Sequence, residues 1–194
     1  KPHQVIEVCG SVEFRRDQIV MSVVAGLTFD QLQAAVAPAR LIKLMPNVAA
    51  SVGAGTTLLL KRGAMNDLHE AERLFRVGGH VEYLDSETQF DAAMALSGCG
   101  PAYLFVAMEA MADGAVAAGL PRDKALRLAA SAVLGAGELA MDVGEHPGEL
   151  KDSVTSPGGV TIEAIRILER HGFRSALIEA ILGAVSKSKE MQQS

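Results

Sequence analysis

The segment DSVTSPGGVT, residues 152–161, places hydroxyl side chains around a Pro-Gly-Gly turn directly before an amphipathic stretch. Free backbone N–H groups at a helix start attract anions. The two glycines leave room for an incoming carboxylate, and the hydroxyls of Ser156 and Thr161 offer neutral hydrogen-bonding groups beside it. Lys151 is the only positive residue close by, and there is no Gly-rich phosphate loop. The residue types therefore favour a small carboxylic acid over a phosphate.

The same segment has a second interpretation, in which it only punctuates two helices. Ser156 or Thr155 would then cap the second helix, Pro157 and the glycines would form a turn, and Thr161 would be an incidental first-turn residue. The residue types alone leave both interpretations open.

The other chemically active side chains predict no metal site and no nucleophile. The five histidines and two cysteines show no metal-ligand spacing, so we expect no bound metal. Cys99 lies in SGCGPAY without an identifiable base, and we expect a packing residue at a helix start rather than a catalytic thiol. Two widely spaced thiols are typical of a reducing compartment.

Composition limits the class of protein. The chain has 194 residues, of which 49% are hydrophobic, which is enough for a substantial core. A net charge of −5 argues against a broad nucleic-acid surface. There is no run of about 18 uncharged apolar residues and no signal-peptide pattern. We therefore expect a cytoplasmic protein that binds neither nucleic acid nor membrane.

The elements that must position the turn differ between the two parts of the chain. In the first part, strand-like runs alternate with helical spacing over 28–36 and 65–79, and Thr28 with Gln31 predicts a capping box. The predicted strands are 18–26, 40–47, 56–61 and 80–84. This alternation favours a mostly parallel sheet with helices on its faces, which binds ligands beyond the carboxyl ends of its strands.

The second part, from residue 91, has helical patterns and no convincing strand. The predicted helices are 101–119, 120–141, 147–154, 160–172 and 173–191. The first of these carries only two charges, Glu109 and Asp113, on one face. A helix that is apolar nearly all round must be buried nearly all round, so we expect an intertwined homodimer.

Several stretches closely resemble the pyrroline-5-carboxylate reductase family. They are LSGCGPAYLFVAMEAMADGAVAAGLP, HPGELKDSVTSPGGVTIEAIRILERHGFRSALIEAI, the opening KP, SVVAGLT and MPN, in order and at suitable spacing. The resemblance covers essentially the whole chain, and DSVTSPGGVT is its most specific part. It implies reduction of 1-pyrroline-5-carboxylate to L-proline with NADPH or NADH, the last step of proline biosynthesis.

The resemblance also implies a fold and an assembly. We expect an α/β Rossmann-type domain over residues 1–90, followed by an all-α helical dimerisation and substrate domain over residues 91–194. Homodimers of this kind often assemble into decamers. The family begins with a strand and a G-x-G-x-x-G turn that this sequence does not contain, so we expect the Rossmann-type domain to be truncated at its N-terminus. The fragment alone is then expected to be inactive if the protein itself lacks that part.

By the same resemblance, Thr161 and Ser156 are the expected catalytic residues. The expected substrate-binding residues are Gly158, Gly159, Val160, Thr161 and Glu87. The expected cofactor-binding residues are Lys1, Ala25, Gly26, Met45, Pro46, Asn47 and Ser153. Hydride transfer to a protonated C=N bond needs mainly proximity and orientation, which agrees with the absence of a nucleophile from these sets.

Two rival functions remain at this point. The chain could be a non-catalytic helical dimerisation fragment. It could also be a related two-domain imine or β-hydroxyacid reductase. The hydroxyacid reductases use a lysine in their helical domain as proton donor, and Lys124 and Lys151, the only lysines between residues 90 and 160, lie outside any obvious substrate motif.

Overall fold

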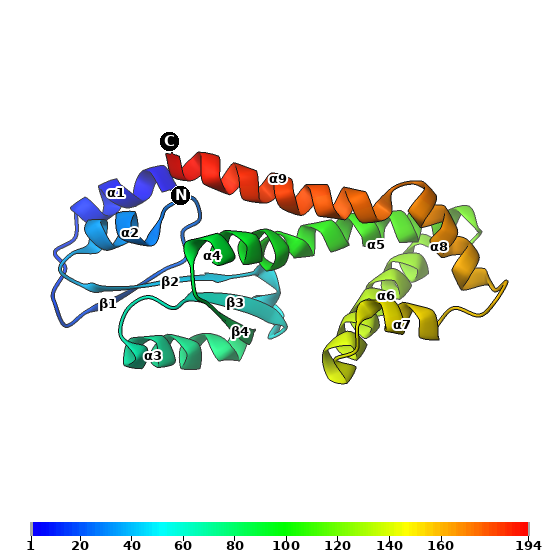
Figure 1. Ribbon diagram of the computed structural model, residues 1–194, viewed down its shortest axis with the longest axis horizontal. Helices are drawn as coiled ribbons and strands as arrows, with labels where there is room; N and C mark the ends of the chain where they lie inside the picture. The colour runs from blue at the N-terminus through cyan, green and yellow to red at the C-terminus, as the bar shows by residue number, and fades with distance from the viewer. Residues whose placement is uncertain (1, 194) are drawn as a thin grey trace. The chain divides into compact units, whose positions relative to one another are not determined.

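The computed structural model describes residues 2–193, with side chains from residue 4 to residue 192 (Figure 1). Contacts within the chain divide it into two compact units. The first, here the sheet unit, is built from the chain up to Pro101 together with the segment that starts at Ala180. The second, here the helical unit, is Ala102–Glu179. The domain boundary predicted after residue 90 stays a prediction.

The sheet unit contains four strands in the order β1-β2-β3-β4. They are β1 (Ile19–Ser22), β2 (Arg40–Pro46), β3 (Gly55–Leu60) and β4 (Gly79–Leu84), one in each predicted strand region. β1 pairs with β2 in parallel, and β3 pairs with β4 in parallel. β2 and β3 are antiparallel, so the expected mostly parallel sheet is a mixed one. Residues 47–54, including the 3-10 turn η1 (Val48–Val52), join β2 to β3 and are too few for a parallel crossover.

Helices cover both faces of this sheet, as the α1, α2 and α3 ribbons of Figure 1 show. α1 (Pro2–Gly10), α2 (Phe29–Val36) and α4 (Glu87–Ala93) lie on one face, and α3 (Met65–Phe75) followed by η2 (Arg76–Gly78) lies on the other. Successive strand residues point to opposite faces. One core therefore takes Leu41, Leu58 and Leu60, and the other takes Ile42, Leu44 and Leu59.

The start of α2 follows the predicted capping box. The Thr28 hydroxyl accepts from the Gln31 N–H at 3.2 Å, and the Gln31 side chain accepts from the Thr28 N–H at 2.8 Å. This reciprocal pair satisfies two N–H groups that a helix start otherwise leaves free.

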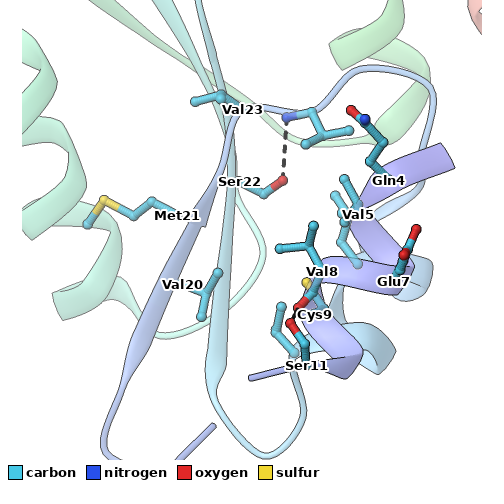
Figure 2. A pocket seen from close by; sticks show the side chains of 13 residues that line it. Gln4, Val5, Glu7, Val8, Cys9, Ser11, Val20, Met21, Ser22 and Val23 are labelled. Atoms are coloured by element: carbon cyan, nitrogen blue, oxygen red, sulfur yellow. Dashed lines mark hydrogen bonds between the residues drawn. The ribbon is translucent and has the colours of Figure 1, made fainter. Parts of the chain in front are cut away.

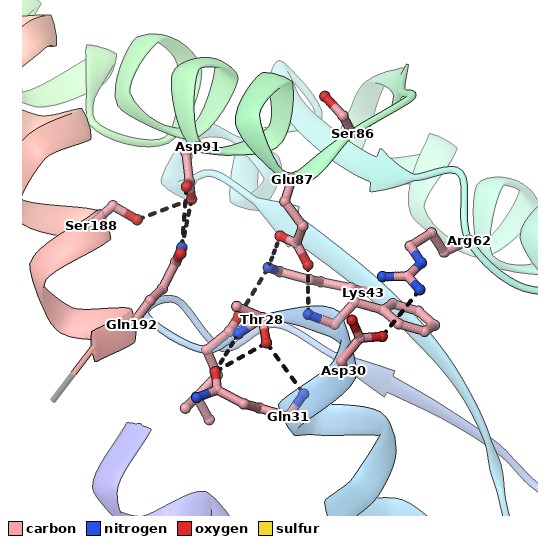
Figure 3. Close-up of polar contacts among 12 residues, drawn as sticks. Thr28, Asp30, Gln31, Lys43, Arg62, Ser86, Glu87, Asp91, Ser188 and Gln192 are labelled. Carbon is pink, nitrogen blue, oxygen red and sulfur yellow. Dashed lines mark hydrogen bonds and ion pairs between the residues drawn. The ribbon is translucent and has the colours of Figure 1, made fainter.

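A buried carboxylate joins two distant parts of the sheet unit. Asp91, on α4, is 4% exposed. It accepts hydrogen bonds from the Ser188 hydroxyl at 3.0 Å and from the Gln192 amide at 3.0 Å, both on α9 (Phe173–Gln193) (Figure 3). This pairing satisfies a charged group that burial would otherwise penalise.

The second part of the chain is helical, as predicted, with no strand among its described residues. Besides α9 it contains α5 (Gly100–Ala117), α6 (Arg122–Val143), α7 (Pro147–Ser153) and α8 (Val160–Arg170). α5 ends at Ala117, and Gly119, the last residue of the range predicted for this helix, has φ +100°. The buried core of the helical unit is small, and centres on Ala112, Ala125 and Ala129.

α4, the π-helical turn η3 (Met94–Gly98) and α5 form one helix, Glu87–Ala117. By length and composition alone it is apolar enough to cross a membrane, although no such helix was predicted from the sequence. Only 17% of its most apolar 18-residue window is buried in this chain. Phe105 is 59% exposed and Val106 is 69% exposed. This helix needs a further apolar surface to cover it.

Candidate functional site

The carboxyl ends of β1 and β2 form the first part of the candidate site. Because these strands are parallel, with Ser22 opposite Lys43, the segments that leave them start at the same sheet edge. Ala25 and Gly26 lie on the segment after β1, and Gly26 is buried with φ +77°. A side chain at that position would be strained, so this backbone conformation favours glycine.

Met45 and Pro46 end β2 at the same edge, and Asn47 follows as the N-cap of η1. The Asn47 side-chain oxygen accepts from the N–H groups of Ala49 and Thr56, each at 3.2 Å, and its amide donates to the Ser97 carbonyl at 3.0 Å. Asn47 therefore ties the start of the β2–β3 connection to the π-helical turn η3. Of the predicted cofactor residues, the structure brings these three together with Ala25 and Gly26.

An ion pair lies beside the segment after β1 (Figure 3). Lys43, at the middle of β2, has a side chain only 3% exposed, and its ammonium lies 2.6 Å from a Glu87 oxygen. Glu87 stands in the first turn of α4, after the N-cap Ser86. Both of its oxygens accept hydrogen bonds inside the sheet unit, the second from the N–H of Phe29 at 2.5 Å.

A cavity of about 720 Å³ lies between α1, β1 and α2 (Figure 2). Its wall is mostly apolar and includes Val5, Val8, Val20 and Leu32. The segment after β1 contributes Val23 and Val24 to the lining, directly before Ala25. The lining residues include none of the predicted site residues, so the cavity borders the candidate site without containing it.

The hydroxyl-rich turn forms the second part of the candidate site, in the helical unit. If the segment only connected two helices, Ser156 or Thr155 would cap α8. The N-cap of α8 is instead Gly159, and neither hydroxyl caps this helix. The Thr155 hydroxyl donates to the Asp152 carbonyl at 3.0 Å, and the Ser153 hydroxyl donates to the Leu150 carbonyl at 2.7 Å. The hydroxyls of Ser153 and Thr155 thus close the end of α7 and leave the start of α8 open.

The two glycines of this turn are required for different reasons. Gly158 has φ +66°, in the left-handed region that side chains disfavour. Gly159 has an ordinary φ of −79°, but a Cβ there would lie 2.3 Å from the Ser156 hydroxyl oxygen. Ser156, Val160 and Thr161 are exposed, Val160 by 90%. Two hydroxyls and the uncapped N–H groups of α8 therefore surround an open surface that suits an anion.

The predicted site residues fall into two groups, one in each unit. The edge group and Glu87 belong to the sheet unit, and Ser153 with Ser156–Thr161 belongs to the helical unit. Lys1 lies outside the described residues. Among the residues that the structure describes, no three His, Cys, Asp or Glu side chains are grouped as metal ligands.

Sequence reasoning missed Lys43. The signal was present, because a lysine in the otherwise apolar run RLIKLMP must either reach the surface or find a partner. The partner, 44 residues away, could not be inferred from the pattern of either segment.

Comparisons with known proteins agree on one family. Residues 87–191 match the family model described as pyrroline-5-carboxylate reductase dimerisation. The pyrroline-5-carboxylate reductase of Escherichia coli is 41% identical over 199 residues, which cover 100% of this chain and 74% of the relative.

Two solved structures superpose on nearly the whole chain. A pyrroline-5-carboxylate reductase from Coxiella burnetii has a TM-score of 0.88 at 34% identity, covering 100% of this chain and 74% of its own. The pyrroline carboxylate reductase of Plasmodium falciparum, with NADP bound, has a TM-score of 0.90 at 28% identity, covering 98% and 78%. The match therefore extends over both units.

Proposed function

The chain belongs to the pyrroline-5-carboxylate reductase family, and on that premise we propose how its residues divide the reaction. The protein is an oxidoreductase that reduces 1-pyrroline-5-carboxylate to L-proline with NADPH or NADH. The observation that carries this function is the 41% identity to the Escherichia coli enzyme over the whole chain. Identity of this extent over the whole chain also excludes the two rival assignments, a hydroxyacid reductase and a purely structural protein.

The sheet edge is the proposed cofactor side of the site. Ala25 and Gly26 carry little or no side chain, and we propose that a flat ring binds against them beside the carboxyl end of β1. Met45, Pro46 and Asn47 would line the same crevice from the end of β2. The bound dinucleotide would supply the hydride, and these residues would hold its nicotinamide end. As the family resemblance implies, the substrate would be bound by the turn of the partner chain. Lys1 and Ser153 keep their predicted cofactor contacts as part of this proposal.

The turn before α8 is the proposed substrate side. The N–H groups around Gly158, Gly159 and Val160, with the Ser156 hydroxyl, would bind the carboxylate, which the helix dipole also favours. The exposed Thr161 hydroxyl would then hydrogen-bond near the ring nitrogen. Binding both ends of the imine orients its carbon for the hydride, and orientation is most of what this reaction needs. The direct substrate contact predicted for Glu87 stays a prediction. Both oxygens of Glu87 already accept hydrogen bonds within the sheet unit.

The protein is a homo-oligomer, since residues 87–191 form a dimerisation domain of this family. We propose a homodimer through residues 91–194, and decamers built from such dimers. A dimer partner would cover the exposed apolar side chains of the helix Glu87–Ala117. We also propose that the protein is cytoplasmic and binds neither membrane nor nucleic acid. The net charge of −5 supports the absence of nucleic-acid binding, and burial of the apolar helix in the dimer supports the absence of membrane binding.

The test is a coupled measurement of coenzyme oxidation and proline formation. The protein is mixed with 1-pyrroline-5-carboxylate and either NADPH or NADH. We expect one L-proline, identified by mass spectrometry, for each coenzyme oxidised. Coenzyme oxidation with a β-hydroxyacid precursor or a different cyclic imine, and none with 1-pyrroline-5-carboxylate, would refute the assignment.

A further inference from the structure

Lys43 is a buried cation at the middle of β2, close to the proposed cofactor edge. Its ammonium donates to the Leu27 carbonyl at 2.9 Å and to Glu87 at 2.6 Å, and lies 4.8 Å from the centre of the Phe90 ring. Figure 3 shows Lys43 reaching from the sheet to Glu87 at the start of α4. All three partners are fixed parts of the sheet unit, so this side chain has one defined position.

Glu87 extends the same contact to the chain on the other side of Thr28. One of its oxygens binds Lys43, and the other accepts from the N–H of Phe29 at 2.5 Å. The ion pair therefore holds the carbonyl before Thr28 and the N–H after it. Gly26 directly precedes Leu27, so the hydrogen bond from Lys43 to the Leu27 carbonyl restrains the chain immediately after the turn at Ala25 and Gly26.

The ion pair is not the main cap of α2, although Glu87 satisfies the Phe29 N–H that the capping box leaves free. The side chains of Thr28 and Gln31 already form a complete capping box there. Burying an ion pair costs desolvation energy that the attraction often only offsets, and apolar replacements are often as stable. The distinct effect of Lys43 and Glu87 is to fix where the segment before α2 lies on the sheet.

We propose that Lys43 and Glu87 are positioning residues for the reductase reaction, which hold the Ala25–Gly26 turn where the nicotinamide end of the cofactor binds. This inference rests on the proposed function. It gives Glu87 a task on the cofactor side, exerted through Phe29 and Lys43, that does not require contact with the substrate.

The test compares Lys43→Met with Glu87→Gln in the whole enzyme. Methionine keeps the apolar stem of Lys43 and removes both donated bonds, whereas glutamine keeps an acceptor for Phe29 and removes the charge. Lys61→Met is the matched control, because Lys61 forms an exposed ion pair with Asp85 at 2.8 Å next to the end of β4. Hydrogen exchange over residues 23–29, coenzyme affinity by calorimetry and the KM for 1-pyrroline-5-carboxylate are measured for each variant.

We expect Lys43→Met to raise both amide exchange over 23–29 and the coenzyme Kd by roughly tenfold, as for loss of a hydrogen bond to a charged group. The KM for 1-pyrroline-5-carboxylate should stay within about twofold, because that substrate is held from the helical unit. Glu87→Gln should show the same pattern at smaller size, and Lys61→Met should leave all three quantities unchanged.

Three results would overturn the proposal. They are unchanged exchange over 23–29 in both variants, raised exchange with an unchanged coenzyme Kd, and the same changes in Lys61→Met. If Lys43→Met does not fold, Glu87→Gln decides between these outcomes alone. Coenzyme binding by the wild-type protein is measured first, before any variant is made. A wild-type protein that binds neither NADPH nor NADH would refute the proposed function itself.

Discussion

At the scale of single residues, the turn before α8 shows why one short segment resembles both a helix connection and a binding site. The hydroxyls of Ser153 and Thr155 donate hydrogen bonds to backbone carbonyls of α7. Those of Ser156 and Thr161 are exposed beside an uncapped helix start. The helix connection therefore uses the hydroxyls of Ser153 and Thr155, and the proposed binding would use the other two.

The Thr161 hydroxyl is predicted to act on the reaction and not on folding. Thr161→Ala should raise the activation barrier by about 2–4 kcal/mol, by analogy with loss of one donor to a transition state. Steady-state kcat/KM is the measurement, and the thermal midpoint should not move. Thr155→Ala is the matched control, because its hydroxyl serves only the Asp152 carbonyl. An unaltered kcat/KM in Thr161→Ala would remove this residue from the mechanism.

Gly159 is predicted to be required because a larger residue would occupy the space next to the Ser156 hydroxyl. In Gly159→Ala the new Cβ must displace the Ser156 hydroxyl, which would otherwise lie 2.3 Å away. We expect a higher KM for 1-pyrroline-5-carboxylate and an unchanged Kd for the coenzyme, whose proposed binding residues lie mainly on the sheet unit.

Gly172→Ala separates this effect from backbone strain. Gly172 has φ +72° and open space around it, so alanine there should cost about 1–2 kcal/mol of folding free energy and leave both affinities alone. If Gly159→Ala weakened substrate and coenzyme equally in calorimetry, the turn would be a structural element only.

At the scale of elements, local patterns were sufficient for most helices and strands. The four strands, α2 with its capping box, α3, and the helices from α5 to α9 all form where periodicity and turn residues predict them. Four features were not predicted in this way. No helix was predicted for the stretches that form α1 and α4. The antiparallel β2–β3 pair was missed, although it follows from the short connection between the two strands. The π-helical turn η3 makes a distant contact, from Asn47 to Ser97, that no local pattern encodes.

The candidate site was predictable to the extent that its residues belong to local motifs. The turn at 156–161 and the strand ends at 25–26 and 45–47 lie in segments with distinctive residue types. The pairing of Lys43 with Glu87 depends on folding of the sheet, and no short-range pattern encodes it.

The link between α3 and β4 should make stability depend on pH in a defined window. The Tyr83 hydroxyl donates to Glu72 at 2.7 Å. The hydrogen bond from Tyr83, with a second from Arg76, lowers the pKa of Glu72 below its ordinary 4.5. Burial, with the Glu72 hydrogen bond, raises the pKa of Tyr83 to about 12 from its ordinary 10.0.

These two shifts have opposite signs. The contribution of Glu72 is present above pH 4.5 and is lost as pH falls through its lowered pKa. The contribution of Tyr83 is complete below pH 10.0 and is lost as pH rises towards about 12. Tyr83→Phe should therefore lower the free energy of unfolding in urea by a constant amount between these limits, and by less outside them. A difference that grows above pH 10.0 would contradict this assignment.

At the scale of the whole molecule, the helix Glu87–Ala117 predicts an obligate dimer. Phe105→Glu places a charge on its exposed apolar surface, and we expect dissociation together with loss of activity. Val77→Glu, on the sheet unit and 83% exposed, is the matched control for the added charge. Analytical ultracentrifugation distinguishes the species, and an obligate interface should bury more than roughly 2,000 Å². A stable, folded wild-type monomer at micromolar concentration would contradict this prediction.

The order in which a ribosome makes this chain follows from the hydrogen bonds of Asp91. Ser188 is synthesised 97 residues after Asp91, and the whole helical unit emerges between them. At about 5–20 residues per second, this interval is roughly 5–20 seconds. During it the nascent sheet unit has a carboxylate at an incomplete surface, while the helices of the helical unit are still being synthesised. Closure of the sheet unit thus has to wait until Ser188 has been synthesised, and a polypeptide released before Ser188 would leave Asp91 without the hydrogen bonds from Ser188 and Gln192.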